Sequence, residues 1–437
     1  MPPSRLLPAR QFYISALPPE LLSEIFLNLT ALQSENQRKI VATLSLVCCR
    51  WKGIAYATPR LWTHCACSSF GKSPAFDRFK SLILASRLSG SHSLYLALRS
   101  DHYAWTKLRE TLSIVASKVH HLDLYLTVGA AITALQTRIN INSENEDEHH
   151  WDRLETMKLV LQQRRRGRLC LVPLLSGKDA TMGHMPRLVD LTLEGAQVAG
   201  FLLAGLKPTF PWSQLTRLEI NTQESQTHVF AILRQCHSLE DCHLHFKGHL
   251  SSEVSDEIFL PRLRSLTFYV NPLVFVFTPE AFLDCFKLPA LEKFSMKLDF
   301  PGDWFPPIHV TSLLQKCRST LRELVLENLL LSEQEYIELL KDLVNLEELT
   351  VRNHEVRCLF LIHGLNRGFL PRLVKIRLEL GQDAEDGYLA ALFHDFVASR
   401  TCKGGGSSSL LTSGNLGEFS DLQSWSLATC HIDYDDY

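Results

Sequence analysis

Few residues of this sequence have the types and spacing that metal binding requires. His64, Cys65 and Cys67 lie close enough to bind a metal, but their spacing is not that of a zinc finger and no matching second pair follows. Scattered cysteines are usually buried free thiols. His149 and His150 follow the acidic run Glu144 to Glu148, which is typical of a solvated loop. The sequence therefore predicts no metal site and no cofactor.

The motifs of the common nucleotide-binding sites and hydrolases are absent. Gly71-Lys72-Ser73 has the last residues of a phosphate-binding loop, but Ala66 stands where that loop requires a glycine. No G-x-S-x-G, H-E-x-x-H, G-x-G-x-x-G or C-x-x-C pattern occurs. The basic run Arg164 to Arg168 is typical of a nuclear localisation signal, a phosphate-binding segment or an exposed loop. We expect no catalytic residue, and an enzyme with a dispersed active site is the alternative.

The composition is that of a soluble, folded chain. The 437 residues include 46% hydrophobic and 21% charged residues, and their length allows two or three globular units. Lys and Arg total 45 against 47 Asp and Glu, which argues against nucleic acid or a membrane surface as partner. No run approaches the roughly 18 apolar residues of a membrane span, and no signal peptide is evident. The scattered cysteines then indicate reduced thiols in the cytoplasm or the nucleus.

Three short helices are predicted within the first sixty residues. A helix is predicted to begin at Leu17-Pro18-Pro19-Glu20. Proline is tolerated in a first turn because the backbone N–H that it lacks would have no hydrogen-bond partner there. Apolar residues recur at helical spacing from Leu21 to Leu29, and after a polar segment from Ile40 to the stop at Thr58-Pro59. The first apolar stripe is wider than three short helices can bury, so it needs a partner surface. A helical cap for the rest of the chain is the alternative.

The amino-acid sequence of this segment also resembles that of a known family. The strings LPPELLSEIF and LSLVCCRWKGIAYATPRLW, from Leu17 to Trp62, resemble the F-box family in the form common among fungal F-box proteins. In that family the segment is a three-helix module that binds the Skp adaptor of the Skp-cullin-F-box ubiquitin ligase. The resemblance therefore implies the adaptor as direct partner, with the cullin and the RING subunit as indirect partners. The adaptor-binding positions that it implies are Leu17, Pro18, Glu20, Leu21, Leu22, Ile25, Phe26, Leu46, Val47, Cys48, Trp51 and Ile54.

The rest of the chain repeats one apolar spacing. The pattern L-x-x-L-x-L begins at residues 154, 188, 215, 239, 263, 291, 321, 346 and 373, at intervals of 24 to 34 residues. Leucine-rich repeats are about 20 to 29 residues long. Similar runs start at Leu94, Val119 and Leu422. Each Leu-x-Leu core predicts a short strand with one buried face, and HVFAILRQC, PEAFLDCFKL, HVTSLLQKC and EQEYIELLKDL predict helices between strands. An ordinary α/β domain is the alternative.

Residues that alternate with the repeat leucines should point away from the core. Repeat proteins use this face for partners, and its mixed charge here indicates a polar protein target. His243 and His245 share it and therefore suit a binding surface better than a metal site. The candidate substrate-binding residues are Arg217, Glu219, Asp241, His243, His245, Thr267, Tyr269, Lys293, Lys297, Glu323, Glu327, Arg352, Lys375 and Arg377.

Together these features predict an α/β protein. A small N-terminal three-helix F-box is followed by an irregular leucine-rich-repeat solenoid with short parallel strands and outer helices. The expected parts are a leader (1–14), the F-box (15–66), the solenoid (67–403), a flexible Gly/Ser linker (404–417) and a last strand with an acidic tail (418–437). The expected function is that of a non-catalytic ligase subunit that binds a protein substrate. A non-ligase leucine-rich-repeat scaffold is a further alternative.

Overall fold

The computed structural model describes fourteen segments of the chain. They are residues 14–31, 37–68, 75–100, 114–127, 151–162, 185–195, 210–222, 226–246, 257–270, 283–302, 307–329, 331–353, 370–380 and 424–429. Several predicted features lie outside or almost wholly outside these residues. They are the leader, the Gly/Ser linker, the acidic tail, the run Gly71 to Ser73, the two histidines after the acidic run and the arginine run. Within them, no helix has the length and apolar character needed to cross a membrane.

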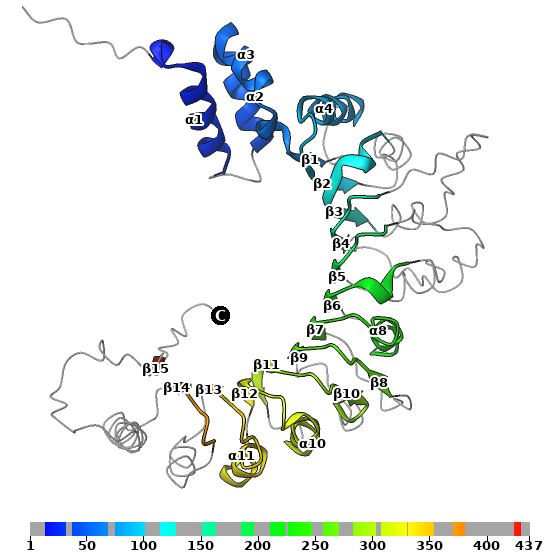
Figure 1. Cartoon of the computed structure of the whole chain (residues 1–437), viewed down its shortest axis with the longest axis vertical. Coiled ribbons are helices and arrows are strands. Elements are labelled where there is room, and N and C mark those ends of the chain that lie inside the picture. Colours follow the sequence, from blue (N-terminus) through cyan, green and yellow to red (C-terminus); the bar gives the residue numbers. More distant parts are fainter. Residues whose placement is uncertain are drawn as a thin grey trace, which may run out of the picture. The chain divides into compact units, whose positions relative to one another are not determined.

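The chain divides into two compact units. The first unit comprises Met1–Lys158 and Thr181–Arg187, and the second comprises Leu159–Ala180 and Leu188–Tyr437. Figure 1 shows helices at the start of the first unit, and parallel strands with helices in the second. The architecture is therefore mixed α/β, with N-terminal helices followed by a solenoid-like region of parallel strands, as the sequence predicted. The domain boundaries stated above stay a prediction.

The first unit opens with the three predicted helices. These are α1 (Pro19–Ala31), α2 (Gln37–Val47) and α3 (Cys49–Ala57), preceded by the 3₁₀ turn η1 (Ile14–Ala16) and followed by η3 (Pro59–Trp62). The first helical hydrogen bond of α1 runs from the Leu22 N–H to the Pro18 carbonyl, so the prolines stand where the N–H group is not needed. The three helices enclose a core of Leu22, Phe26, Val41, Leu44, Ile54, Ala55 and Leu61.

Aromatic and polar contacts hold these helices together. The rings of Phe26 and Trp51 lie 5.0 Å apart and join α1 to α3. The hydroxyls of Ser23 and Thr58 lie 3.0 Å apart. The Trp62 indole donates to the Ala55 carbonyl at 2.8 Å, which fixes η3 against α3. This module therefore has an apolar core of its own.

The remaining elements of the first unit begin the strand series. They are β1 (His64–Ser68), α4 (Ala75–Leu88), β2 (Leu94–Ser100), the turn η5 (Ala116–Lys118), β3 (Val119–Thr127) and the start of β4 (Thr156–Gln162). Strand β2 lies parallel to β1 on one side and to β3 on the other. Both α2 and α4 contact β1, so the helical module packs directly on the first strand. The two runs that echo the repeat pattern here, from Leu94 and Val119, are buried strands, as predicted.

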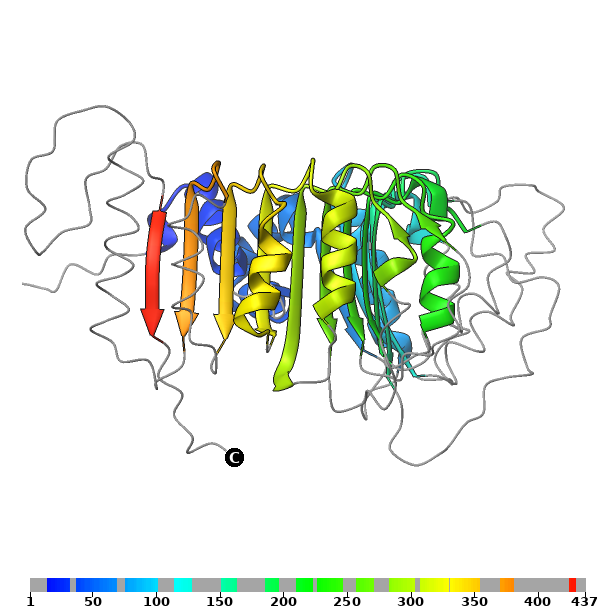
Figure 2. The ribbon, with the colours of Figure 1, turned by 90° about the horizontal axis from the view of Figure 1, so that it is seen from below.

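The second unit is a series of parallel strands in chain order. They are β5 (Asp190–Gly195), β6 (Arg217–Thr222), β7 (Asp241–Phe246), β9 (Ser265–Val270), β11 (Lys293–Gly302), β12 (Glu323–Leu329), β13 (Glu348–Asn353), β14 (Lys375–Leu380) and β15 (Ser424–Thr429). Figure 2 shows the later strands side by side with their arrows pointing the same way. A separate pair, β8 (Ile258–Phe259) and β10 (Phe286–Lys287), is also parallel.

The predicted leucine register is confirmed across this sheet. The middle apolar residue of each unit pairs with that of the next, from Leu191 through Leu218 and onward to Ile376. Of the repeat leucines or their substitutes whose side chains the structure describes, all are at most 7% exposed. Each fully buried leucine contributes about 1.5 to 3 kcal/mol, so stacking of units stabilises the fold.

A repeated backbone contact fixes this register. The carbonyl of the residue just before each strand accepts two hydrogen bonds from the next unit, as Arg264 does from the N–H groups of Glu292 and Lys293 at 2.9 and 2.8 Å. The same pair of bonds recurs at the carbonyls of Val189, Thr216, Glu240, Glu292, Arg322 and Glu347. The L-x-x-L spacing supplies the two residues that make it, and this explains why the spacing recurs.

Helices lie on one side of the second unit's sheet (Figures 1 and 2). These are α8 (Gln226–Leu233), α10 (Pro307–Cys317) and α11 (Glu333–Leu340), while η6 (Trp212–Gln214) precedes β6. At the start of α11 the Ser332 and Glu335 side chains each accept a hydrogen bond from the other's backbone N–H, which completes the capping box of that helix.

Three of the four predicted helices between strands are thus confirmed. The prediction of a helix through PEAFLDCFKL was wrong at its end, where Phe286–Lys287 forms β10. Phe286 is fully buried, and its ring packs against those of Phe230 and Phe268 at 5.7 and 5.8 Å. Tertiary packing therefore overrides the helical periodicity at this point.

Candidate functional surfaces

Helix α1 carries two apolar stripes of different character. Leu22 and Phe26 recur at intervals of four, are fully buried and belong to the core. Leu21, Ile25 and Leu29 have the same interval but are 52%, 37% and 44% exposed. Successive residues of a helix are about 100° apart, so the second stripe lies beside the first and faces outward. Such a stripe is typical of a helix that buries one face within its own module and another against a partner.

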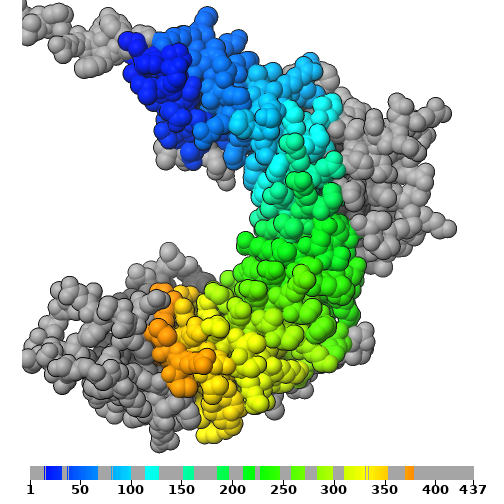
Figure 3. Space-filling view, in the orientation of Figure 1, coloured from blue at the N-terminus to red at the C-terminus, as the bar shows by residue number. Residues whose placement is uncertain are grey.

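The junction of α2 and α3 adds to this exposed apolar surface. Leu46 and Val47, at the end of α2, are 86% and 56% exposed. The Arg50 guanidinium donates to the Leu17 carbonyl, so the junction lies beside the start of α1. We name Leu21, Ile25, Leu29, Leu46 and Val47 the docking surface. Figure 3 shows α1, in dark blue, at the surface of the first unit with α2 and α3 beside it.

The twelve positions implied by the F-box resemblance separate into two groups. Pro18, Glu20, Leu21, Ile25, Leu46, Val47 and Cys48 are exposed. Leu22, Phe26 and Ile54 are core residues, and Leu17 and Trp51 are packed against that core. Leu22 in particular is fully buried, because its side chain is enclosed by the three helices. Its side chain helps to hold α1 against the other two helices, and its predicted contribution to adaptor binding stays a prediction.

Leu29 is absent from those twelve positions, although its interval of four from Ile25 could have identified it. Whether the exposed positions contact an adaptor stays a prediction.

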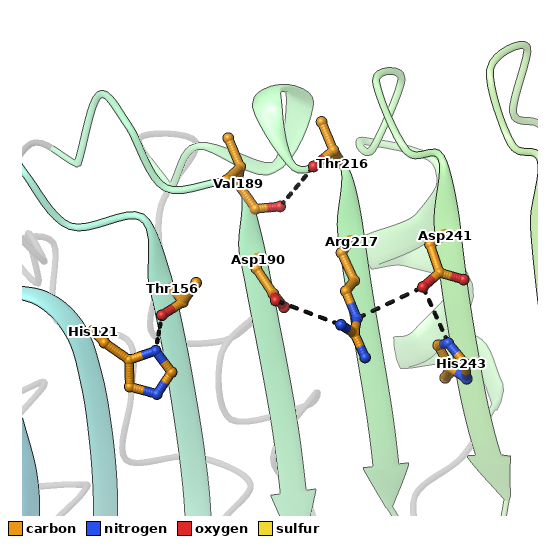
Figure 4. A network of polar contacts seen from close by, with 8 residues as sticks. All are labelled: His121, Thr156, Val189, Asp190, Thr216, Arg217, Asp241 and His243. Carbon is orange, nitrogen blue, oxygen red and sulfur yellow. Dashed lines mark hydrogen bonds and ion pairs between the residues drawn. The ribbon is translucent and has the colours of Figure 1, made fainter. Parts of the chain in front are cut away.

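The second unit presents rows of polar side chains on the sheet face opposite its buried leucines. Asp190, Arg217 and Asp241 are equivalent residues of adjacent strands. Their side chains form a row of ion pairs, in which Arg217 lies 4.0 Å from the Asp190 carboxylate and 3.6 Å from the Asp241 carboxylate (Figure 4). His243 Nε2 lies 3.1 Å from Asp241 Oδ2. The hydrogen bond with His243 lowers the pKa of Asp241, although burial opposes this.

A second row lies four residues further along the same strands. Lys297 lies 3.1 Å from Glu327 and 5.2 Å from the Tyr269 ring, and Arg352 donates to Glu327 from the other side. The rings of His245 and Tyr269 are 5.1 Å apart. Burial acts to lower the pKa of Lys297, but the hydrogen bond and charge of Glu327 outweigh it and raise that pKa. One carboxylate therefore joins two cations across three strands.

All fourteen predicted substrate-binding residues lie at the alternating positions of this face. Thirteen of them are partly exposed or exposed, and Thr267, which is 8% exposed, is buried. The first row continues through Lys293, 2.7 Å from Glu323, and Lys375, 2.7 Å from Glu348. Residues of the same rows that sequence reasoning omitted are Asp190, Thr192, Asn221, Ser265, Ser295, Val325, Glu348 and Thr350. Contact with a target stays a prediction.

The first unit holds a polar cluster of its own. The rings of His64, Tyr95 and His121 stack across β1, β2 and β3, with centroids 5.2 and 4.4 Å apart. Asp123 accepts from the Tyr95 hydroxyl, and His121 Nε2 lies 3.2 Å from its other oxygen. The Thr156 hydroxyl contacts His121 Nδ1 (Figure 4). These contacts join four neighbouring strands through their side chains.

The charges in this cluster are coupled. Partial burial of the ring lowers the pKa of His64, and the nearby His121 lowers it further. Burial acts to raise the pKa of Asp123, but hydrogen bonds from His121 and Tyr95 outweigh it and lower that pKa. The cluster is therefore most stable with Asp123 ionised and His64 neutral.

The described cysteines match the prediction of buried thiols only in part, because Cys48 and Cys49 are exposed and Cys285 is partly buried. Cys65, Cys236, Cys242 and Cys317 are buried, and burial raises the pKa of the Cys236 thiol to about 12. No described group of three or more His, Cys, Asp or Glu residues is arranged to hold a metal ion. Cys65 is buried while His64 is exposed, because neighbours in a strand point to opposite faces.

Comparison with known proteins identifies the N-terminal module. Residues 14–68 match the F-box-like family model, so this part of the chain is an F-box-like domain. No curated protein matches the chain. Among solved structures, the chain is similar to a chain in the crystal structure of the Rad7 and Elc1 complex of yeast. The identity is 16%, with 84% of this chain and 90% of that chain covered, at a TM-score of 0.38.

Proposed function

We propose that this protein is a substrate-recognition subunit of a Skp-cullin-F-box ubiquitin ligase. The F-box-like domain binds the Skp adaptor, which links it to the cullin and the RING subunit. The second unit, a leucine-rich-repeat-like solenoid, holds a target protein. The chain itself carries no covalent step, and it acts by raising the concentration of the target beside the conjugating enzyme. A cytoplasmic or nuclear location is part of the same proposal.

The docking surface is the observation that carries this proposal. A domain that already encloses its own core leaves Leu21, Ile25 and Leu29 exposed on one helix. Exposed apolar side chains at regular spacing gain free energy when a partner covers them, at about 25 cal/mol per Å². The match of residues 14–68 to the F-box-like family supports an adaptor of the Skp type as that partner.

The sheet face of the second unit supports the other half of the proposal. Its outward rows hold cations, carboxylates, a tyrosine and histidines on neighbouring strands. A rigid sheet holds such groups at fixed separations, so a partner with complementary groups is distinguished from others. The scaffold alternative differs from this proposal only in lacking the ligase.

The test of adaptor binding is a carboxylate placed in the docking surface. Ile25→Asp puts an unpaired charge where the adaptor would exclude water, and we expect binding to weaken at least 100-fold because a buried, unpaired charge costs several kcal/mol. Binding of the purified Skp adaptor is measured by titration calorimetry with the full chain. Circular dichroism establishes that the variant is folded.

The matched control is Leu84→Asp. Leu84 lies in α4, outside the F-box-like match, and is 39% exposed against 37% for Ile25. The same chemical change there should alter the affinity less than twofold. If the folded Ile25→Asp variant binds the adaptor as the parent does, or if residues 69–437 alone still capture it, the ligase proposal fails.

A further inference from the structure

The segment that contains α2 and α3 carries a positive charge that no nearby acidic residue in the sequence balances. Six Lys and Arg residues and no Asp or Glu occur from residue 36 to residue 76, although the whole chain has 45 Lys and Arg against 47 Asp and Glu. The four of these cations whose side chains the structure describes are all exposed. We name them the basic surface, which consists of Lys39, Arg50, Lys52 and Arg60.

The cations of the basic surface are open to a partner. Among the described residues, Lys39, Lys52 and Arg60 form no ion pair. The Lys52 ammonium lies 5.8 Å from the centre of the Tyr56 ring, a contact that orients the cation and leaves its charge in place. Cations in the polar rows of the second unit, in contrast, pair with carboxylates of neighbouring strands. The basic surface therefore has the free charge that those rows lack.

The basic surface adjoins the docking surface. Lys39 and Leu46 both belong to α2, and a separation of seven residues is only about 20° short of two full turns, so their side chains lie on one side of the helix. At about 1.5 Å per residue they are roughly 10 Å apart along the helix axis. Arg50 and Lys52 lie in the first turn of α3, close in sequence to Val47 at the end of α2. A partner that covers the docking surface therefore meets the basic surface at its edge.

This position corresponds to the rim of an interface. A standard protein interface covers about 800 Å² of each partner and has an apolar centre and a polar rim. Unpaired cations at the rim attract a partner with carboxylates opposite them and repel a partner with cations there. A separation of about 10 Å equals one Debye length in 0.1 M salt, so the cations act on an approaching partner before contact. Such attraction raises the association rate more than it changes the dissociation rate.

We infer that the basic surface faces a carboxylate-bearing part of the adaptor, beside the apolar contact made by the docking surface. This inference rests on the proposed function, in which the adaptor covers the docking surface. It adds the charge that the adaptor carries at this place. Ile25 and its apolar neighbours then hold the bound adaptor, while Lys52 and Arg60 accelerate its arrival. Nucleic acid is another polyanion that cations attract, but the exposed apolar side chains of Leu46 and Val47 match a protein surface better than a phosphate backbone.

Association kinetics test the inference. The full chain is immobilised for biolayer interferometry, and the purified Skp adaptor is supplied in solution at 50 or 500 mM NaCl. Lys52→Glu and Arg60→Glu should each lower the association rate about three- to tenfold at the lower salt concentration and change the dissociation rate less than about twofold. At the higher salt concentration the association rates should agree with that of the parent within about twofold, because the charges are screened.

Arg262→Glu is the matched control, since Arg262 is an exposed cation of the second unit that forms no ion pair among the described residues. It should change the association rate less than about twofold, because its charge is not at the rim of the docking surface. Circular dichroism establishes that each variant is folded. Association rates of both F-box-like variants within twofold of the parent at 50 mM NaCl, or an equal loss in Arg262→Glu, would overturn the inference.

A second titration uses fluorescein-labelled single-stranded DNA of thirty nucleotides. Submicromolar binding in 150 mM NaCl that Lys52→Glu abolishes would also overturn the inference, because the basic surface would then belong to nucleic acid. The proposed function is judged separately by the parent chain. Adaptor binding that is insensitive to these charges contradicts the basic-surface inference alone, whereas a parent chain that does not bind the adaptor contradicts both.

Discussion

The F-box-like domain and the sheet face of the second unit leave opposite kinds of side chain exposed. On α1 the outward stripe is apolar, with Leu21, Ile25 and Leu29 uncovered. On the sheet the outward rows are charged residues paired with one another, as Lys297 and Arg352 are with Glu327. Both regions have complete apolar cores beneath these surfaces.

The difference teaches how two binding surfaces can be separated within one chain. An apolar stripe gains affinity from burial of area, needs few exact positions and suits one constant partner. A polar sheet face gains little net affinity from each ion pair but rejects partners whose groups do not match. The proposed function therefore assigns constant docking to the helices and selection to the strands. The following experiments test the difference in burial and charge pairing on which this assignment rests.

The largest expected effects are losses in the free energy of unfolding when core leucines, but not outward-facing leucines, are replaced. Leu324→Ala and Leu349→Ala remove fully buried side chains that pair across β12 and β13, and each should cost about 2 to 5 kcal/mol in the free energy of unfolding. Leu22→Ala should cost a similar amount in the first unit. Leu21→Ala, one residue away on the exposed stripe, should cost less than about 0.5 kcal/mol.

Chemical denaturation measures these losses. If both Leu324→Ala and Leu349→Ala cost less than about 0.5 kcal/mol, the repeat register is wrong.

Smaller losses in the free energy of unfolding are expected when two carboxylates of the second unit are replaced, and the two losses should differ. Glu327 is 15% exposed and joins two cations, so Glu327→Gln leaves both without their shared counter-charge and should cost about 1 to 3 kcal/mol. Among the residues that the structure describes, Glu347 pairs with Arg322 alone, at 2.6 Å, where the Glu347 and Arg322 side chains are 38% and 59% exposed. Glu347→Gln should cost at most about 1 kcal/mol because solvent screens the pair. Equal losses in thermal unfolding would contradict a special role for the Glu327 row.

The smallest effect is a dependence of stability on pH in the first unit. Folding lowers the pKa of His64 from its usual 6.5, so the neutral form is favoured and its contribution is complete above that pH. The contribution is lost as the pH falls through the lowered value. Asp123 also has a lowered pKa, so its contribution is present above about pH 4 and is lost in stronger acid.

The melting temperature should therefore fall between pH 7 and pH 5, and by less in His64→Phe, which keeps a ring against Tyr95. An unchanged pH dependence in that variant would exclude His64 as the source.

Much of the fold could be predicted from particular residues. The spacing of Leu321, Leu324 and Leu326 predicted a strand with one buried face, because alternation along a strand is fixed by backbone geometry. The apolar spacing of EQEYIELLKDL predicted a helix for an equally local reason, and α11 forms there. PEAFLDCFKL had the same kind of pattern, but Phe286 found partners in Phe230 and Phe268 and became a strand instead. Contacts between units are not encoded in the spacing of one unit.

The candidate surfaces were predictable only in part, for the same reason. By itself the sequence determined which residues are apolar at a helical interval in α1 and which alternate with leucines in the strands. Only the tertiary structure decided that Leu22 is enclosed while Leu21, Ile25 and Leu29 are exposed, because burial depends on where α2 and α3 pack. It likewise decided which charges meet, since Glu327 acquires Lys297 and Arg352 as neighbours only when strands about 25 to 30 residues apart in the chain are aligned side by side.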